Sequence, residues 1–344
     1  MVGGSSRDPT SGDTLVTTAL VVGVGAVGTR AARQLVDTPG IERVLLADRD
    51  VTQLREVADA LGPDVQAIDF LPGDPLPAEV AVVATALPAG VDHDVVAASI
   101  AAGVPVASSE DEHDAIDQLR ALVPNAAAAG VTIAIGCGLA PGLSDVLVRH
   151  AAGIFDTIDE IRVARTGWAG PASVATVRHE RRVMARTWHD GGWREEHPHG
   201  DSLVWFPEPI GARDCRTVTA GTALLVDAFP TVPRVSVQLG EPPRRTRFRR
   251  RFGDEGEWGA ARVEVWGRRA GTFDTVVYGV VERTAVAAGT MLAVVASRLV
   301  GVLEPRVVNP GVHGPAALTD PVPLLGELAK RGVRAAAFEG VAVA

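Results

Sequence analysis

Short apolar runs alternate with stretches of helical periodicity from Thr18 to Ile135. In the first of them, Leu20, Val21 and Val22 form an apolar run, and apolar residues then recur at helical intervals from Ala31 onwards. Short runs followed by a 3.6-residue period predict buried strands that lead into helices. We expect strands at 20–22, 44–47, 64–68, 80–85, 104–107 and 131–135, and helices at 50–61, 92–102 and 110–129, the last broken near Pro124. Strands that alternate with helices predict an α/β fold, a doubly wound parallel sheet with helices on both faces.

From about residue 154 the pattern changes to strand-like segments with sparse helical periodicity between them. Such segments cover 161–166, 202–206, 217–219, 235–239, 262–266 and 275–281. They predict a second, α+β unit with a mostly antiparallel sheet and short helices. The chain becomes helical again from Thr284.

The apolar run between Arg283 and Arg298 is shorter than the ~20 residues that span a bilayer, so it predicts a buried core helix. After it we expect a Pro/Gly-rich loop at 309–315 and a short helix at 320–330. A last strand or extended segment is expected at 333–338. This tail should pack back against the first unit.

Three glycines stand between the first strand and its helix in the spacing G-x-G-x-x-G: Gly23, Gly25 and Gly28. Gly23 allows a tight turn, Gly25 lets the backbone approach a pyrophosphate, and Gly28 lets the helix pack closely on the strand. The helix N-terminus offers free N–H groups and a positive dipole end to phosphates. Glycine-rich turns also close ordinary strand–helix units, so this motif alone leaves both interpretations open.

A second feature favours the dinucleotide interpretation. The strand at 44–47 ends at Asp48, roughly 20 residues past the glycine turn, where an acidic residue accepts hydrogen bonds from the adenine ribose. Arg49 follows and is able to bind a 2′-phosphate. The pattern therefore favours NAD and leaves NADP open.

The carboxyl ends of the parallel strands should line the cofactor crevice of a Rossmann domain. That edge comprises the residues just after each strand, including 108–110 and 136–141. The expected cofactor-binding residues are Gly23, Gly25, Ala26, Val27, Gly28, Asp48, Arg49, Thr85, Ala86, Leu87, Pro88, Gly138, Pro141 and Gly142.

The predicted domain organisation follows from these patterns. A flexible tail covers 1–16, and a Rossmann NAD(P)-binding domain covers 17–140. An α+β domain for substrate binding and dimerisation covers 141–283. A helical segment at 284–344 packs back on the Rossmann domain.

Charge and composition limit the kinds of binding partner and site that we expect. The 344 residues carry a net charge of −9, which argues against nucleic acid and anionic membranes as partners. The arginine run at 244–251 is interpreted as a solvated loop or a charged sheet edge. Cys137 and Cys215 do not form a disulfide framework in a chain of this size, which favours a cytoplasmic protein. His197 and His199 indicate a solvated loop, and no metal site is expected.

Several segments together resemble the saccharopine dehydrogenase-like oxidoreductases, which include saccharopine reductases and lysine dehydrogenases. The resemblance rests on the glycine motif, on 47–50, 84–88 and 102–104, and on 138–145 with its Pro-Gly turn into a helix, and extends to 206–211 and 311–315. It implies a Rossmann domain joined to a substrate domain beside the nicotinamide, and hydride transfer at the C–N centre of an amino acid or an imine-linked opine. The family often has a Tyr-Val-Asp-type sequence after the fifth strand, where this chain has 105–110, so the substrate stays open.

Such a reaction needs a group that moves one proton and groups that anchor substrate carboxylates. His93, His179 and Glu110 are the catalytic candidates, since histidine and buried carboxyls serve as acids and bases near neutral pH. An exposed helix start at His93 and a helix cap at Glu110 are the alternatives. Arg165 and Arg213 are the candidates for binding a substrate carboxylate, and surface salt bridges are their alternative.

The leading hypothesis is therefore an NAD(P)-dependent oxidoreductase that acts on a small amino-acid-like substrate, as a homodimer. A non-catalytic NAD(P)-binding redox sensor or enzyme relic is the second hypothesis, because no obvious acid–base pair stands out. The third is a dehydrogenase of a hydroxy or sugar substrate.

Overall fold

The computed structural model describes residues 17–196, 202–241, 255–318 and 320–337. The predictions made for the tail at 1–16, for the arginine run at 244–251, and for His197 and His199 lie outside the described residues.

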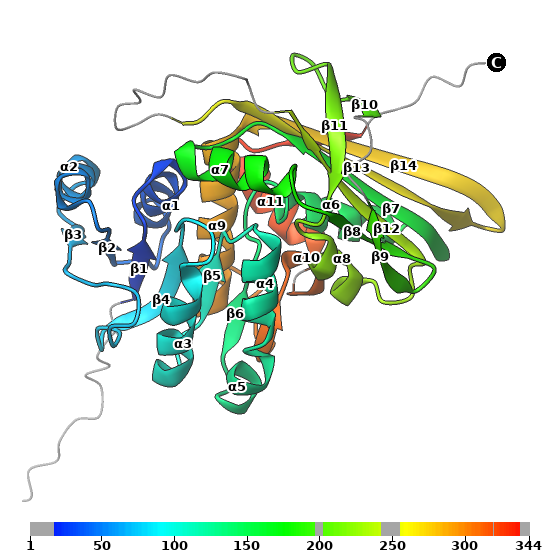
Figure 1. Cartoon of the computed structure of the whole chain (residues 1–344). Helices are drawn as coiled ribbons and strands as arrows, with labels where there is room; N and C mark the ends of the chain where they lie inside the picture. The colour runs from blue at the N-terminus through cyan, green and yellow to red at the C-terminus, as the bar shows by residue number, and fades with distance from the viewer. Residues whose placement is uncertain (1–16, 197–201, 242–254, 319, 338–344) are drawn as a thin grey trace, which may run out of the picture.

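A seven-stranded sheet forms the first half of the molecule, and every pairing in it is parallel (Figure 1). Its strand order is β15-β6-β5-β4-β1-β2-β3. The strands are β1 (Thr18–Val22), β2 (Arg43–Ala47), β3 (Val65–Ala67), β4 (Val80–Thr85), β5 (Val106–Ser108), β6 (Thr132–Ala134) and β15 (Gly311–His313). The helices between them are α1 (Ala26–Val36), α2 (Val51–Leu61), α3 (Asp92–Ala102), α4 (His113–Arg120) and α5 (Val123–Ala128).

Alternate residues of each strand face opposite layers of helices. Ala19 and Val21 of β1 belong to a core with α1, whereas Leu20 and Val22 belong to a core with α3 and α4. Strands buried on both faces read as continuous apolar runs, which is why the sequence predicted them. The predicted doubly wound parallel sheet is confirmed.

A mixed, mostly antiparallel sheet forms the second half. Its strand order is β10-β11-β12-β7-β13-β14-β16, with β8 paired to β12 and β9 paired to β8. Among the described strands, only β12 and β7 are parallel neighbours. Its strands are β7 (Thr157–Thr166), β8 (Ala185–His189), β9 (Gly192–Glu196), β10 (Ser202–Trp205), β11 (Ala212–Val218), β12 (Arg234–Gly240), β13 (Trp258–Arg269), β14 (Thr272–Arg283) and β16 (Ala335–Ala337). Its helices are α6 (Leu143–Ala152), α7 (Pro171–Glu180) and α8 (Thr222–Ala228).

The segment after Thr284 contributes to both sheets. Its helices are α9 (Thr284–Val300), α10 (Pro315–Leu318) and α11 (Pro321–Lys330). Helix α9 is almost entirely buried and packs on α1, β4 and β5, so the expected core helix is confirmed. In the described part of the chain, no helix is both long and apolar enough to cross a membrane.

Two short strands of this segment differ from expectation. The expected loop at 309–315 contains β15, which extends the parallel sheet beside β6. A three-residue Gly-Val-His strand has too little apolar periodicity to stand out, and its pairing partner supplies the hydrogen bonds. Strand β16 joins the second sheet beside β14, so the tail does not pack on the first unit alone.

Close packing between α1 and α9 depends on Gly289. A Cβ at this position would lie 2.6 Å from the carbonyl oxygen of Val27 and 2.7 Å from Cβ of Arg30. Gly289→Ala should therefore push α1 away and lower the free energy of unfolding by about 1–3 kcal/mol.

The matched control is Gly326→Ala in α11, where an added Cβ meets no atom within 4 Å. Because alanine is the better helix former, this variant should gain about 0.5–1 kcal/mol. Chemical denaturation of both variants measures the contrast, and equal stabilities would contradict the packing argument.

Candidate active site

The three glycines of the turn have the backbone geometry and the close packing expected of them. Gly23 has φ +93°, and Gly28 packs so closely that its Cβ would lie 1.7 Å from the carbonyl oxygen of Gly23. Gly25 is the N-cap residue of α1, and nothing lies within 4 Å of a Cβ added there. The turn is thus tight beneath the helix and open above Gly25, where N–H groups of the first helical turn face outward.

Asp48 lies beside this turn. Its carboxylate accepts hydrogen bonds from the backbone N–H of Val24 at 2.7 Å and of Asp50 at 2.9 Å. Gln53 donates its side-chain amide to the Val24 carbonyl at 2.8 Å. The bond from Val24 holds the Asp48 carboxylate against the glycine loop, and its oxygens keep lone pairs for further donors.

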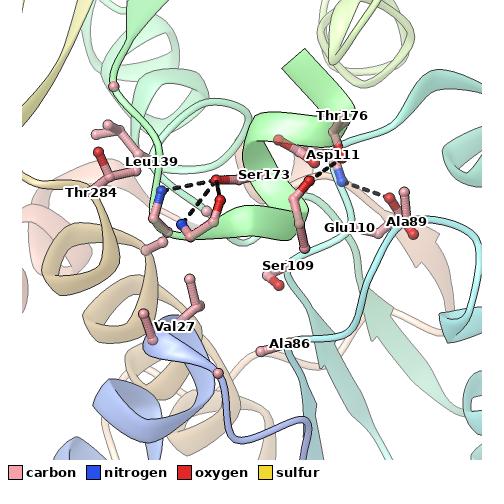
Figure 2. Close-up of a pocket in the computed structure, with 18 of the residues that line it drawn as sticks. Val27, Ala86, Ala89, Ser109, Glu110, Asp111, Leu139, Ser173, Thr176 and Thr284 are labelled. Carbon is pink, nitrogen blue, oxygen red and sulfur yellow. Dashed lines mark hydrogen bonds between the residues drawn. The ribbon is translucent and has the colours of Figure 1, made fainter. Parts of the chain in front are cut away.

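A cavity opens between the carboxyl ends of the first sheet and the second sheet (Figure 2). It is lined by the glycine turn, by the loops after β4, β5 and β6, by β7 and α7, and by the start of α9. The lining includes Gly25, Ala26, Val27, Ala86, Leu87, Ser109, Glu110, Asp111, Gly138, Pro141, Arg165, Ser173, Thr176 and Thr284.

Glu110 is the buried acid of this cavity, with 4% of its surface exposed. Its Oε1 accepts from the N–H groups of Asp111 and Glu112, both at 3.0 Å, and its Oε2 accepts from Gly90 at 2.8 Å. Burial and then the nearby charge of Asp92 raise the pKa of Glu110 to about 8. Glu110 is therefore poised to hold or release a proton near neutral pH.

Asp92, the first residue of α3, ties together the strand ends behind Glu110. It is 2% exposed, and its Oδ2 accepts from the hydroxyls of Thr85 and Ser108, the last residues of β4 and β5. Ser108 Oγ in turn accepts from the N–H of Glu110 at 3.0 Å. Burial raises the pKa of Asp92.

Arg165, near the end of β7, supplies a positive charge to the cavity. Its Nη2 lies 2.8 Å from Oδ2 of Asp111, an ion pair that joins the second sheet to the loop after β5. Burial raises the pKa of Asp145 to about 7 and that of Glu180 to about 7, and the charge of Arg165 opposes both shifts. The guanidinium therefore has several acidic neighbours.

Helix α7 lies over the cavity and begins there (Figure 2). Ser173 Oγ accepts from the N–H groups of Ala169 at 2.9 Å and Gly170 at 3.2 Å, and Pro171 stands in the first turn. Proline and a capping hydroxyl at these positions fix the start of the helix. The buried side of α7 is partly polar, with Thr176 and Glu180.

Comparison with solved structures gives this architecture a precedent. Saccharopine dehydrogenase (L-Glu forming) from Saccharomyces cerevisiae matches with a TM-score of 0.66 and 16% sequence identity, over 94% of this chain and 100% of that one. The chain has the fold of saccharopine dehydrogenase. An amine dehydrogenase from Mycobacterium smegmatis matches with a TM-score of 0.54 and 14% identity, over 88% of this chain and 96% of that one. No family model matches the sequence.

The resemblance found in the sequence is thus confirmed at the level of the saccharopine dehydrogenase fold. In this fold, the candidates Glu110 and Arg165 line the same cavity. His93, His179 and Arg213 do not line it. His93 is at the start of α3, where Nδ1 lies 3.2 Å from Asp94; His179 is on the exposed side of α7; and Arg213 is exposed on β11.

The predicted cofactor-binding residues fall into two groups in the saccharopine dehydrogenase fold. Gly25, Ala26, Val27, Ala86, Leu87, Gly138 and Pro141 line the cavity. The others do not line it, with Arg49 exposed and Thr85 buried against Asp92: Gly23, Gly28, Asp48, Arg49, Thr85, Pro88 and Gly142. Cys137 is fully buried, consistent with a packing role.

The structure also places at or near the cavity several residues that the sequence did not predict. Asp111 follows Glu110 directly, so the strand pattern could have predicted its position at the crevice. Asp92, Glu180 and Thr284 come from other elements, and nothing in their local sequence marks them. Among the described residues, no group of three or more His, Cys, Asp or Glu side chains is arranged to hold a metal ion.

Proposed function

We propose that this chain is an NAD(P)-dependent oxidoreductase that transfers a hydride at the C–N centre of a small nitrogen-bearing metabolite. Amino acids and imine-linked opines are the substrates that the resemblance implies. One observation carries the proposal: a single cavity joins the open glycine turn of α1 to the buried acid Glu110 and to Arg165.

The residues at the glycine turn fit a dinucleotide. The open space above Gly25 and the start of α1 suit a pyrophosphate, and the fixed carboxylate of Asp48 suits ribose hydroxyls. A bound nicotinamide would supply hydride transfer to or from the carbon that carries nitrogen, a reaction that interconverts C–N and C=N and moves one proton.

Glu110 is the residue that handles this proton in the proposal. As a carboxylate it accepts a proton from the substrate ammonium, and as an acid it returns one. Its three backbone N–H donors hold the carboxyl in place in either state. A pKa near the working pH suits a group that must do both.

Cofactor fluorescence with a panel of amines, amino acids and keto acids tests the proposed function. We expect NADH or NADPH binding, followed by turnover with at least one amine or carbonyl compound plus ammonia. Binding without turnover across the panel would favour a redox sensor, and turnover of alcohols alone would favour C–O chemistry. No nucleotide binding would reject the proposal outright.

Asp48→Asn should weaken NAD binding about 10-fold or more, because a hydrogen bond to a charged group contributes about 1.5–3 kcal/mol. The loss should be smaller for NADP. Asp50→Asn is the matched control, since Asp50 caps α2 through Gln53 N–H and asparagine caps equally well. Titration of nucleotide fluorescence gives both affinities, and equal affinities for the two variants would contradict the role of Asp48.

We also propose a cytoplasmic homodimer. Strand β10 is at one edge of the described second sheet, and its Leu203 and Trp205 are 60% and 61% exposed. An exposed edge with apolar side chains suits pairing with a second copy.

A further inference from the structure

Asp111 and Arg165 form an ion pair inside the cavity. Both residues line it, the two side chains are 22% and 10% exposed, and Oδ2 of Asp111 lies 2.8 Å from Nη2 of Arg165. They reach it from different halves of the fold, one from the loop after β5 and the other from β7. The pair is therefore part of the substrate-facing wall.

The position of Asp111 matters because of how arginine binds carboxylates. A guanidinium holds a carboxylate best through two parallel N–H groups, such as Nε and Nη2. Asp111 already lies against Nη2 as an ion pair at 2.8 Å, while Nε and Nη2 are both buried without a hydrogen-bond partner among the described residues. An incoming carboxylate that pairs with Nε and Nη2 therefore competes with Asp111 for Nη2.

The surrounding carboxyl groups, once ionised, also oppose an incoming carboxylate. Glu110 lines the cavity, and Asp145 and Glu180 lie close enough to Arg165 for its charge to act on them. Asp145 and Glu180 are 2% and 1% exposed, so screening by water is weak. Where these groups are ionised, a substrate carboxylate would add one more anion around a cation that is already paired, whereas an ammonium group meets Glu110.

We propose that Asp111 is a specificity-determining residue that occupies Arg165 and so restricts the cavity to small amines without a carboxylate. This inference rests on the proposed function and narrows its substrate class from amino acids and opines to amines. Arg165 then serves to hold Asp111 and the loop after β5, in place of the carboxylate anchor expected from the sequence.

Binding of propionate tests the inference without any turnover. We expect Asp111→Asn to bind propionate at least about 10-fold more tightly than the wild type in titration calorimetry with NADH present. Asp114→Asn removes the same charge from an exposed position of α4 and should bind like the wild type. The double variant D111N/R165Q should lose the gain, which assigns it to the guanidinium.

Turnover of a matched substrate pair gives the second readout. Propan-2-amine and alanine share the C–N centre and differ by a methyl group against a carboxylate. The wild type should favour propan-2-amine, and Asp111→Asn should shift the ratio of kcat/KM toward alanine by about 10-fold or more.

The outcomes distinguish the role of Asp111 in specificity from the proposed oxidoreductase function. Tight propionate binding by the wild type, or a preference of the wild type for alanine, would overturn the role of Asp111. Absence of turnover with every substrate, together with the expected gain in propionate binding, would reject the proposed function and leave the ion-pair inference standing. Asp111→Ser repeats the binding test if Asp111→Asn unfolds.

Discussion

Replacing Gly25 with leucine should abolish nucleotide binding and leave the fold intact. A Cβ at this position meets no atom within 4 Å, and the φ of −65° is open to any L-residue, so the protein can accommodate the side chain. The leucine would fill the space above the start of α1, where the pyrophosphate belongs in the proposed complex. We expect at least a 100-fold loss of NADH affinity by fluorescence titration, with an unchanged melting temperature.

Gly28→Ala provides the contrast. Its Cβ would lie 1.7 Å from the carbonyl oxygen of Gly23, so α1 must move away from β1. This variant should lose stability as well as nucleotide affinity, whereas Gly25→Leu loses affinity alone. If Gly25→Leu binds NADH like the wild type, the glycine turn is not the nucleotide site.

Replacing Glu110 with glutamine should lower kcat by about 10²- to 10⁴-fold, the range typical of a positioned acid or base. Nucleotide affinity should stay within about twofold, because Glu110 is on the substrate side of the proposed complex. Glu112→Gln is the matched control: Glu112 caps α4 through the N–H of Ala115 and does not line the cavity. Equal kcat values for the Glu110→Gln variant and the wild type would remove Glu110 from the mechanism.

The raised pKa of Glu110 fixes the direction in which the reaction rates should change with pH. Burial, the charge of Asp92 and then that of Asp111 raise its pKa from 4.5 to about 8, while the N–H groups of Gly90 and Glu112 oppose the shift. Amine oxidation needs the carboxylate and should rise as pH passes 8; the reverse reaction needs the acid and should fall.

The same shift affects stability. The folded protein binds a proton at Glu110 that the unfolded chain releases near pH 4.5, so this contribution is complete below that pH and is lost as pH rises through 8. The Glu110→Gln variant lacks this decline. Melting temperatures of both proteins between pH 5 and pH 9 measure it without any substrate.

Much of the first sheet could be predicted from the sequence because its strands are buried on both faces. Strand β4 and helix α3 match the expected ranges, and the break at Pro124 separates α4 from α5. The second sheet was harder to predict from the sequence. The hairpin of β8 and β9 is half-exposed and polar, although its Asp190-Gly191 turn is a typical hairpin sequence. Helix α7 turns Thr176 and Glu180 inward, so it shows no apolar stripe.

The candidate site was predictable where it depends on one rule, that parallel strands present their carboxyl ends to a common crevice. Glu110 follows β5 directly and was placed there on that basis. Its pKa is raised by burial and then by the charge of Asp92, the first residue of α3, which is linked to Glu110 through Ser108. Such through-space contacts leave no trace in local periodicity, and neither does the pairing of Arg165 with Asp111.

The segment from Thr284 to Ala337 supplies α9 and β15 to the parallel sheet and β16 to the mixed sheet. During synthesis the glycine turn and its strands emerge first, yet the helix that covers them is made near the end. The parallel sheet therefore cannot be covered by α9 while the ribosome is still working on the middle of the chain. The crevice, whose wall includes the start of α9, is complete only once α9 has been made.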